Sequence, residues 1–319
     1  MLMFSLAPAY PFALALAEAL DATLSPHEER LFPDGECKLR PLVDPRGADA
    51  YVVHSLHGGP IDSPHDKLCR LLMFIATLKD HGAERVTAVV PYLAYARKDQ
   101  QTKLHDPVNL RYVAQLFDAV GVAQLIVLEA HNVAAFQNAF RCPTVHLSAH
   151  PLFGELAEEL AGTGPLAVAS PDPGGVKRAL LWREALEERL GRPVKFAMID
   201  KRRSAGVLSG GQLVAGEVEG ATVLLLDDLI ASGETLQRSA TALRRAGAKD
   251  VIGCAAHGLF VDNAQKLLAA DGLSRLVVTD SVPPFRLPDD GPVRSKLHVV
   301  SAMPLFAEAI RASHGSWCR

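Results

Sequence analysis

Cysteine is scarce in this sequence, and its spacing follows no pattern. The 319 residues include five cysteines, and no two of them are arranged as Cys-X-X-Cys. An odd number without such spacing argues against a disulfide framework. Because chains without disulfides are typical of a reducing compartment, we expect a cytoplasmic protein.

Long apolar runs are also missing. No stretch reaches the roughly 18 consecutive apolar residues of a candidate membrane-spanning helix. The opening MLMFSLAPAYPFALALAEAL is apolar, but Pro8 and Pro11 interrupt it and no basic segment precedes it, as one would in a signal peptide. We interpret it as a short strand, a loop and then a helix from about Phe12 to Ala22, and we expect no membrane association.

A strong excess of one charge is absent as well. Charged residues make up 22% of the chain, and the formal net charge is −3. Nucleic-acid-binding domains carry a clear basic excess, so we expect no nucleic-acid partner. The chain also has no GxxxxGK[ST] motif, which excludes a P-loop nucleotide site.

Short apolar segments alternate with helical patterns along nearly the whole chain. Their continuous apolar character is typical of parallel strands that are buried on both faces. The predicted strands are AYVVHS (50–55), RVTAVVPYL (85–93), QLIVLEA (124–130), PLAVASPD (165–172), KFAMID (195–200), ATVLLLDD (221–228), DVIGCAAHG (250–258) and RLVVTDS (275–281). Between them, segments such as 66–82 and 235–247 place leucines on one helical face and end at a glycine. The alternation predicts an α/β fold with parallel sheets between helices.

This alternation occurs twice, once in each half of the chain. The length and the 49% hydrophobic content suit two domains with cores of their own. We expect two similar doubly wound domains, residues 1–148 and 149–302. The last helix, residues 303–314, would fold back onto the first domain.

The most informative short stretch is VLLLDDLIASGETL (223–236). Asp227 and Asp228 end an apolar strand, where ligands of open parallel sheets bind. The small residues of the loop that follows, with the start of a helix near Thr235, suit a phosphate monoester. The two carboxylates could accept hydrogen bonds from sugar hydroxyls or hold a divalent cation. The alternative is a capped helix after a solvated acidic strand end.

This stretch resembles the phosphoribosyl-diphosphate binding motif of the type I phosphoribosyltransferase fold. Six further segments resemble those of ribose-phosphate pyrophosphokinases, in that family's order and at about its spacing. They are FPDGECKLRP (32–41), RGADAYVVHS (46–55), PYLAYARKDQ (91–100), SPDPGGVKR (170–178), FAMIDKRR (196–203) and AAHGLF (255–260). The resemblance implies transfer of a pyrophosphoryl group from Mg²⁺–ATP to ribose 5-phosphate, in a self-associating enzyme whose adenine site is shared between subunits.

The resemblance also implies a role for individual residues. The catalytic pair would be Lys201 and Arg203, which match cations that close over the transferring phosphates. The residues for ribose 5-phosphate would be Asp227, Asp228, Ala231, Ser232, Gly233, Glu234 and Thr235. The residues for ATP would be Phe32, Asp34, Glu36, Arg97, Lys98 and His131. The residues near Mg²⁺ would be His131 and Asp172.

Several positions depart from the family pattern. Lys98 stands where the family usually has Gln, and Glu129-Ala130-His131 replaces Asp-Leu-His. Members that phosphate activates usually carry Asp at the position of Ala231 and a Ser-Arg-Ala-Pro-Ile-Ser stretch where this chain reads LHDPVNL (104–110). We therefore expect weak or absent activation by phosphate. A non-catalytic regulatory homologue and a phosphoribosyltransferase remain as alternative functions.

Overall fold

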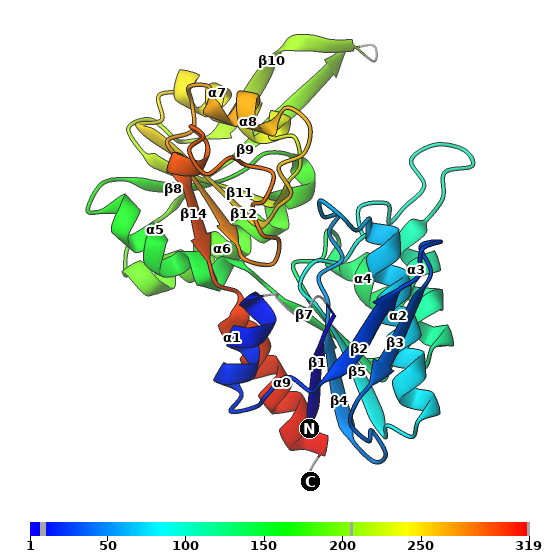
Figure 1. The fold of residues 1–319 in the computed structure, drawn as a ribbon. Helices are drawn as coiled ribbons and strands as arrows, with labels where there is room; N and C mark the ends of the chain where they lie inside the picture. Colours follow the sequence, from blue (N-terminus) through cyan, green and yellow to red (C-terminus); the bar gives the residue numbers. More distant parts are fainter. Residues whose placement is uncertain (7–10, 205–206, 318–319) are drawn as a thin grey trace. The chain divides into compact units, whose positions relative to one another are not determined.

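The structure is a computed structural model in which the chain forms two compact units (Figure 1). Unit 1 runs from Met1 to Ser148 and resumes at Ser301, whereas unit 2 runs from Ala149 to Val300. The model describes residues 1–6, 11–204 and 207–317, with the backbone alone at 160–161, 201–204, 207–212 and 316–317.

Unit 1 is built on a parallel sheet with the strand order β1-β4-β5-β6-β7. The strands are β1 (Leu2–Ser5), β4 (Asp49–Val53), β5 (Arg85–Val90), β6 (Gln124–Leu128) and β7 (Thr144–Leu147). Every residue of β4 is buried, as are all residues of β5 after Arg85. Helices on both faces explain this burial and the continuously apolar sequence.

The helices of unit 1 lie on the two faces of that sheet. They are α1 (Pro11–Ala19), α2 (Pro64–Asp80), α3 (Asn109–Ala119), α4 (Val133–Ala139) and α9 (Met303–Trp317). Figure 1 shows α1 and α9 on one face and α2, α3 and α4 on the other. The rings of Phe12 and Phe306 meet edge to face at 5.4 Å, which packs α9 against α1. At the start of α2, Ser63 and Asp66 form a reciprocal capping box.

A small hairpin packs against α2 outside the main sheet. Its antiparallel strands are β2 (His27–Leu31) and β3 (Cys37–Pro41). The turn between them is closed by hydrogen bonds from Phe32 N–H to the Glu36 carbonyl and from Gly35 N–H to the Phe32 carbonyl. The FPDGE segment therefore forms a tight turn at the end of a strand.

Unit 2 contains a larger sheet with the order β10-β9-β8-β11-β12-β13-β14. Only the pairing of β9 and β10 is antiparallel among the described strands of this sheet. The strands are β8 (Leu166–Ser170), β9 (Lys195–Ser204), β10 (Val207–Gly216), β11 (Thr222–Ile230), β12 (Asp250–Gly258), β13 (Arg275–Thr279) and β14 (Leu297–Val300). The helices are α5 (Gly154–Ala161), α6 (Val176–Leu190), α7 (Glu234–Arg245) and α8 (Ala264–Ala269), with short 3-10 turns η1 (His150–Phe153), η2 (Pro173–Gly175) and η3 (Arg294–Lys296).

The predicted α/β class with doubly wound parallel sheets is confirmed, and each of the eight predicted strands is present. Two details were wrong. The stretch 204–216, read as a loop because it is rich in Gly and Ser, contains strand β10, which is stabilised by its antiparallel partner β9. The first helix ends at Ala19 rather than Ala22, because Asp21 adopts a left-handed backbone (φ 51°).

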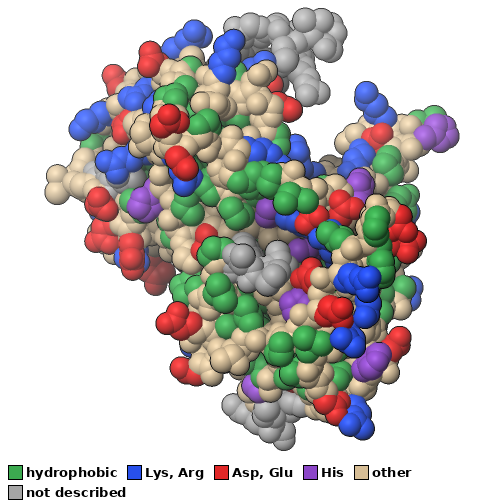
Figure 2. Space-filling view, in the orientation of Figure 1, with side chains coloured by type: hydrophobic (Ala, Val, Ile, Leu, Met, Phe, Trp, Pro, Cys, Tyr) green, Lys and Arg blue, Asp and Glu red, His purple; other side chains and the backbone are tan. Residues whose placement is uncertain are grey.

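In the described part of the chain, no helix combines the length and apolar character needed to cross a membrane. On the face shown in Figure 2, acidic and basic side chains are interspersed over each unit.

Candidate active site

The acidic pair of unit 2 lies in the last part of β11, beyond the end of its neighbour β8. Pairing with β8 stops at Leu225, while pairing with β12 continues to Ile230. Asp227 and Asp228 therefore lie at an edge that β8 no longer covers. The N–H of Asp228 donates to Oδ1 of Asp227 at 2.9 Å, and Asp228 is only 4% exposed.

The electrostatics of this pair are unfavourable in the protein itself. Burial and the adjacent Asp228 charge raise the pKa of Asp227 well above its usual value, and Asp172 adds to the effect. Asp172 follows β8, accepts a hydrogen bond from Gly175 N–H and caps η2. A Cβ at Gly175 would lie 2.7 Å from Ser170 Oγ, so glycine is required for this close turn. The three carboxylates thus share one negative edge of unit 2.

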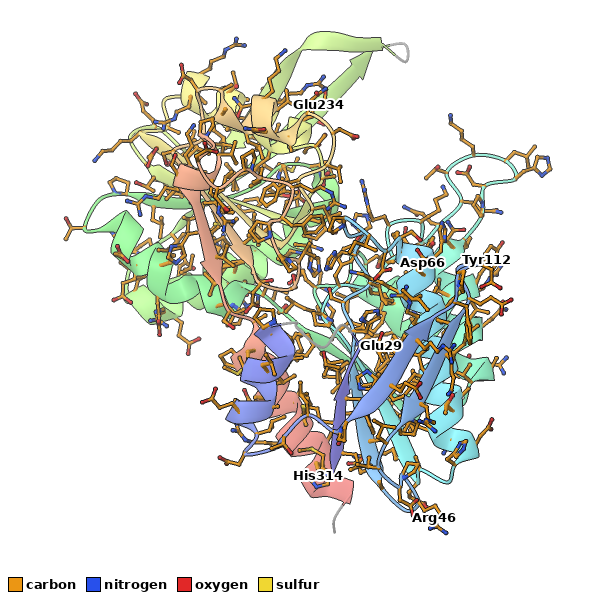
Figure 3. The ribbon with its side chains drawn as sticks, in the orientation of Figure 1. Glu29, Arg46, Asp66, Tyr112, Glu234 and His314 are labelled. Carbon is orange, nitrogen blue, oxygen red and sulfur yellow. The ribbon has the colours of Figure 1, made fainter. Side chains whose placement is uncertain are left out.

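The loop that follows the acids leads directly into a helix. Gly233 adopts a left-handed backbone (φ 78°), and a Cβ there would lie 2.7 Å from the Leu268 side chain. Only glycine fits both conditions. Helix α7 begins at Glu234, one residue before the predicted start (Figure 3). Its N-terminal amides and partial positive charge favour an anion near the loop.

Neighbouring residues hold this loop in place. The N–H of Val261 donates to the carbonyl of Ala231 at 3.0 Å, and Glu234 forms an ion pair with Arg238 one turn along α7. Ser232 and Thr235 are partly exposed, so their hydroxyls can reach a ligand. The loop is therefore a supported turn with donors at its surface.

In unit 1, the FPDGE turn keeps its acidic residues in solvent. Asp34 and Glu36 are exposed, and Asp34 Oδ1 accepts the N–H of Glu36 at 3.1 Å. The Arg30 guanidinium lies 5.0 Å from the centre of the Phe32 ring. A purine that stacks on Phe32 would therefore either contact the Arg30 guanidinium or displace that guanidinium from the ring.

In the segment predicted to hold ATP phosphates, one of the two cations already contacts other residues of the same loop. Arg97 is exposed. Lys98 forms an ion pair with Asp106, with Nζ 2.5 Å from Oδ2, and also donates to Thr102 Oγ1. This pairing was not predicted, because nothing in the sequence marks two charges eight positions apart in a loop as partners.

His131 lies after β6 and is exposed, and two neighbours shape its position. Glu129 is buried with a left-handed backbone (φ 43°), a conformation that is strained for glutamate, and its N–H donates to the Leu147 carbonyl. Asn132 caps α4 by accepting Ala135 N–H, and its amide donates to Asp99 Oδ2 at 2.7 Å. The segment of His131 is thereby tied to the loop of Arg97 and Lys98, a link that the sequence analysis also missed.

Lys201 and Arg203 belong to β9, paired in register with Gln212 and Leu208 of β10. Their side chains lie outside the described part of the structure. Among the described residues, no three His, Cys, Asp or Glu side chains gather into a group that could hold a metal ion.

Comparisons with known proteins cover both units. The N-terminal domain model of ribose phosphate pyrophosphokinase matches residues 1–121, and the phosphoribosyl transferase domain model matches residues 147–277. Ribose-phosphate pyrophosphokinase of Caldanaerobacter subterraneus is 33% identical over 302 residues, which are 95% of this chain and 91% of the relative. The chain belongs to the ribose-phosphate pyrophosphokinase family. Ribose-phosphate pyrophosphokinase 2 of Enterococcus faecalis is 34% identical over 313 residues, or 98% of this chain and 92% of the relative.

A solved structure agrees with this family membership. Phosphoribosylpyrophosphate synthetase from Mycobacterium smegmatis is similar over 99% of both chains, with a TM-score of 0.86 and 33% identity. The protein is therefore an enzyme of the ribose-phosphate pyrophosphokinase family, as the resemblance of the short segments implied.

Proposed function

We propose that the protein transfers the pyrophosphoryl group of Mg²⁺–ATP to the C1 hydroxyl of ribose 5-phosphate. The hydroxyl oxygen forms a bond to the β-phosphorus of ATP, and the bond from that phosphorus to the bridging oxygen of the α-phosphate breaks. AMP leaves with the bridging oxygen, the hydroxyl proton is released, and 5-phosphoribosyl 1-diphosphate is formed.

The observation that carries this proposal is the edge of unit 2 formed by β11 and the start of α7. A phosphate monoester fits the loop Ala231–Thr235, because glycine-dependent geometry places a helix N-terminus beside hydroxyl donors. A sugar fits Asp227 and Asp228, because vicinal hydroxyls would donate to this pair, and the protein leaves the charge of Asp227 poorly stabilised. One ligand with both groups is ribose 5-phosphate.

The remaining residues would bind ATP and stabilise the negative charge of the phosphates during the transfer. Phe32 offers a ring face and Asp34 and Glu36 offer acceptors for an adenine amino group. Arg97 and Lys98 would bind the triphosphate. Lys201 and Arg203 would stabilise the transition state, since phosphoryl-type transfers depend on positioning and on neutralising charge rather than on covalent help.

The residues present suit Mg²⁺ as a cofactor carried mainly by substrate oxygens. Carboxylate oxygens are the ligands that Mg²⁺ prefers, and it usually binds through one or two carboxylates together with substrate phosphates. Asp172 supplies such an oxygen at the negative edge of unit 2, and His131 would lie near the ATP side. When bound, the ion would neutralise and orient the phosphates. We also propose that the protein self-associates, with the FPDGE turn serving the adenine site of a second copy.

The test is product analysis after the protein is mixed with Mg²⁺, ATP and ribose 5-phosphate. AMP formed in equal amount with phosphoribosyl diphosphate is the expected result. Lys201→Ala should lower kcat by at least about 10²-fold, the scale for loss of a preorganised electrostatic contact. Near-normal turnover in that variant would contradict the assigned role. Binding of both substrates without AMP would instead indicate a regulatory homologue.

A further inference from the structure

The loop that joins β5 to α3 is organised around a single carboxylate oxygen. It projects from unit 1 in Figure 1. Oδ2 of Asp106 accepts hydrogen bonds from Lys98 Nζ at 2.5 Å, Thr102 Oγ1 at 2.7 Å, Lys103 N–H at 3.0 Å and Thr102 N–H at 3.1 Å. Two backbone amides, a hydroxyl and an ammonium group that converge on one point form a site for an anion. In this chain the anion is part of the loop.

Lys98 is held at both its side chain and its backbone, and the Asp106 carboxylate is one of the groups that hold the side chain. The side chain is held by Asp106 and Thr102, whereas the backbone carbonyl accepts the N–H of Leu110 at the start of α3, at 3.2 Å. An ammonium group has three donors, and these side-chain contacts use two of them. Within the described part of the chain, one donor is left for a ligand, and its direction is set by the other two.

Apolar packing contributes little to the order of residues 98–106 of this loop. Leu104 at its tip is 85% exposed, and His105 adopts a left-handed backbone (φ 65°). The backbone of Asp106 adds two contacts: its N–H donates to the Lys103 carbonyl at 3.1 Å, and its carbonyl accepts from Gln101 Nε2 at 2.9 Å. Lys98 and the Thr102 hydroxyl hold the pKa of Asp106 far below its usual range, so the carboxylate stays ionised at neutral pH.

We propose that Asp106 is a positioning residue for nucleotide binding. Its carboxylate serves as a built-in anion that shapes residues 98–106 and aims Lys98 at the triphosphate. This rests on the proposed function, because it takes Lys98 to be an ATP contact. The Lys98–Asp106 pair is only partly buried, and ion pairs that water can reach contribute little to global stability. The effect of Asp106 therefore falls on ATP affinity and on local loop order.

The experiment measures ATP binding by calorimetry in the full-length wild type and in Asp106→Ala, Lys98→Ala and the double variant. We expect Asp106→Ala to weaken ATP binding about tenfold, the scale for one lost charge-assisted hydrogen bond. In the Lys98→Ala background the same change should cost less than about twofold, because Asp106 acts through Lys98. Sodium formate should restore a measurable part of the affinity of Asp106→Ala, compared with sodium chloride at equal ionic strength.

Hydrogen exchange gives a second readout that does not depend on ATP. The amides of Thr102 and Lys103 should exchange faster in Asp106→Ala and slow again with formate. The matched control is Asp44→Ala. Exposed Asp44 also accepts hydrogen bonds from both the side chain and the backbone N–H of Arg46. Arg46 (Figure 3) precedes β4, at the end of unit 1 opposite the loop. This variant should bind ATP like the wild type.

Three outcomes would overturn the proposal. Unchanged ATP affinity in Asp106→Ala would show that loop order has no bearing on binding. Tighter binding would show that Asp106 competes with ATP for Lys98. Asp106→Ala could also reduce ATP affinity equally in the wild type and in the Lys98→Ala background. That result would show that Asp106 does not act through Lys98. If the wild type binds no ATP at all, the proposed function fails first, and that result is distinct from the other three.

Discussion

Each unit holds a carboxylate in its sheet, Asp49 fully buried and Asp227 partly buried, and the two carboxylates behave in opposite ways. In unit 1, Asp49 is fully buried but accepts two hydrogen bonds from Arg85, at 2.8 and 2.7 Å, and one from Tyr51. Nδ1 of His314, which is labelled on α9 in Figure 3, lies 2.7 Å from the same carboxylate. Burial opposes its ionisation, yet Arg85 and His314 outweigh burial and lower the pKa of Asp49. In unit 2, burial and a neighbouring acid raise the pKa of Asp227.

The difference separates structural charge from functional charge. Asp49 begins β4, at the amino end of the sheet, and its partners connect two strands with the C-terminal helix. Asp227 lies toward the carboxyl end of β11, where ligands of parallel sheets bind. A buried charge that the protein neutralises holds the fold together. On the proposed function, the charge that the protein disfavours at Asp227 gains its partners from a ligand.

The largest effect is expected from removing the Asp49 carboxylate, whose charge its partners in unit 1 neutralise. Asp49→Asn leaves the Arg85 guanidinium without its buried carboxylate, and loss of one partner of a buried pair typically costs about 3–5 kcal/mol. We expect a drop of this size in the free energy of unfolding, measured by urea denaturation at neutral pH. Because the folded-state pKa of Asp49 is lowered, its stabilisation exists above the unfolded value of 3.8 and is lost as pH falls further. The variant should therefore lose less stability than the wild type on acidification.

Asp44→Asn is the control for this change, since Asp44 forms a comparable pair with Arg46 on the surface. Its effect on the free energy of unfolding should be small beside that of Asp49→Asn, because water screens the exposed pair. An equal cost for both variants would contradict the structural importance of burial at Asp49.

The opposite change is expected at Asp227. Because its folded-state pKa is raised, the folded protein favours the protonated form, and stability falls as pH rises from the unfolded value of 3.8 through the folded value. Asp227→Asn removes a charge that is disfavoured at pH 7, so the urea midpoint should rise. The same variant should bind ribose 5-phosphate about 10-fold to 100-fold more weakly, the scale for loss of a charge-assisted hydrogen bond. A variant that is both less stable and unchanged in binding would contradict the distinction drawn here.

A smaller effect is expected where the Asn132 amide joins its loop to the Asp99 carboxylate. Asn132→Ala removes the hydrogen bond to Asp99 and the cap of α4. We expect a stability loss of about 1 kcal/mol, typical of a missing N-cap, and a KM for ATP raised about fivefold with kcat little changed. The control is Asn138→Ala in the same helix, where the side chain only donates to the Ala134 carbonyl. Equal kinetic effects of the two variants would exclude a role for the Asp99 contact.

The smallest effect is expected from inorganic phosphate. The loop that would hold a regulatory anion already contains the Asp106 carboxylate, and LHDPVNL offers no guanidinium or hydroxyl for another. The initial rate should therefore change less than about twofold over a millimolar phosphate series. A steep rise in rate with phosphate would refute this expectation.

Local patterns in the sequence predicted the sheets and the acidic loop, because apolar runs and small residues act within a few positions of one another. The structural contacts escaped prediction, because each joins residues that no local pattern relates. Asp106 pairs with Lys98 across eight positions, Asn132 with Asp99 across 33, and His314 with Asp49 across 265. Strand β10 was missed because its glycines and serines disfavour a strand, whereas its pairing with the distant partner β9 stabilises it.

The return of α9 to unit 1 has a consequence for protein synthesis. Unit 2 is an insertion in unit 1, so the ribosome completes all of unit 2 before it makes the helix that carries His314 and Phe306. Until that helix emerges, Asp49 lacks one partner and Phe12 lacks the ring it packs against. We therefore expect unit 2 to reach its native state first during translation, and unit 1 to reach its native state only after α9 has been synthesised.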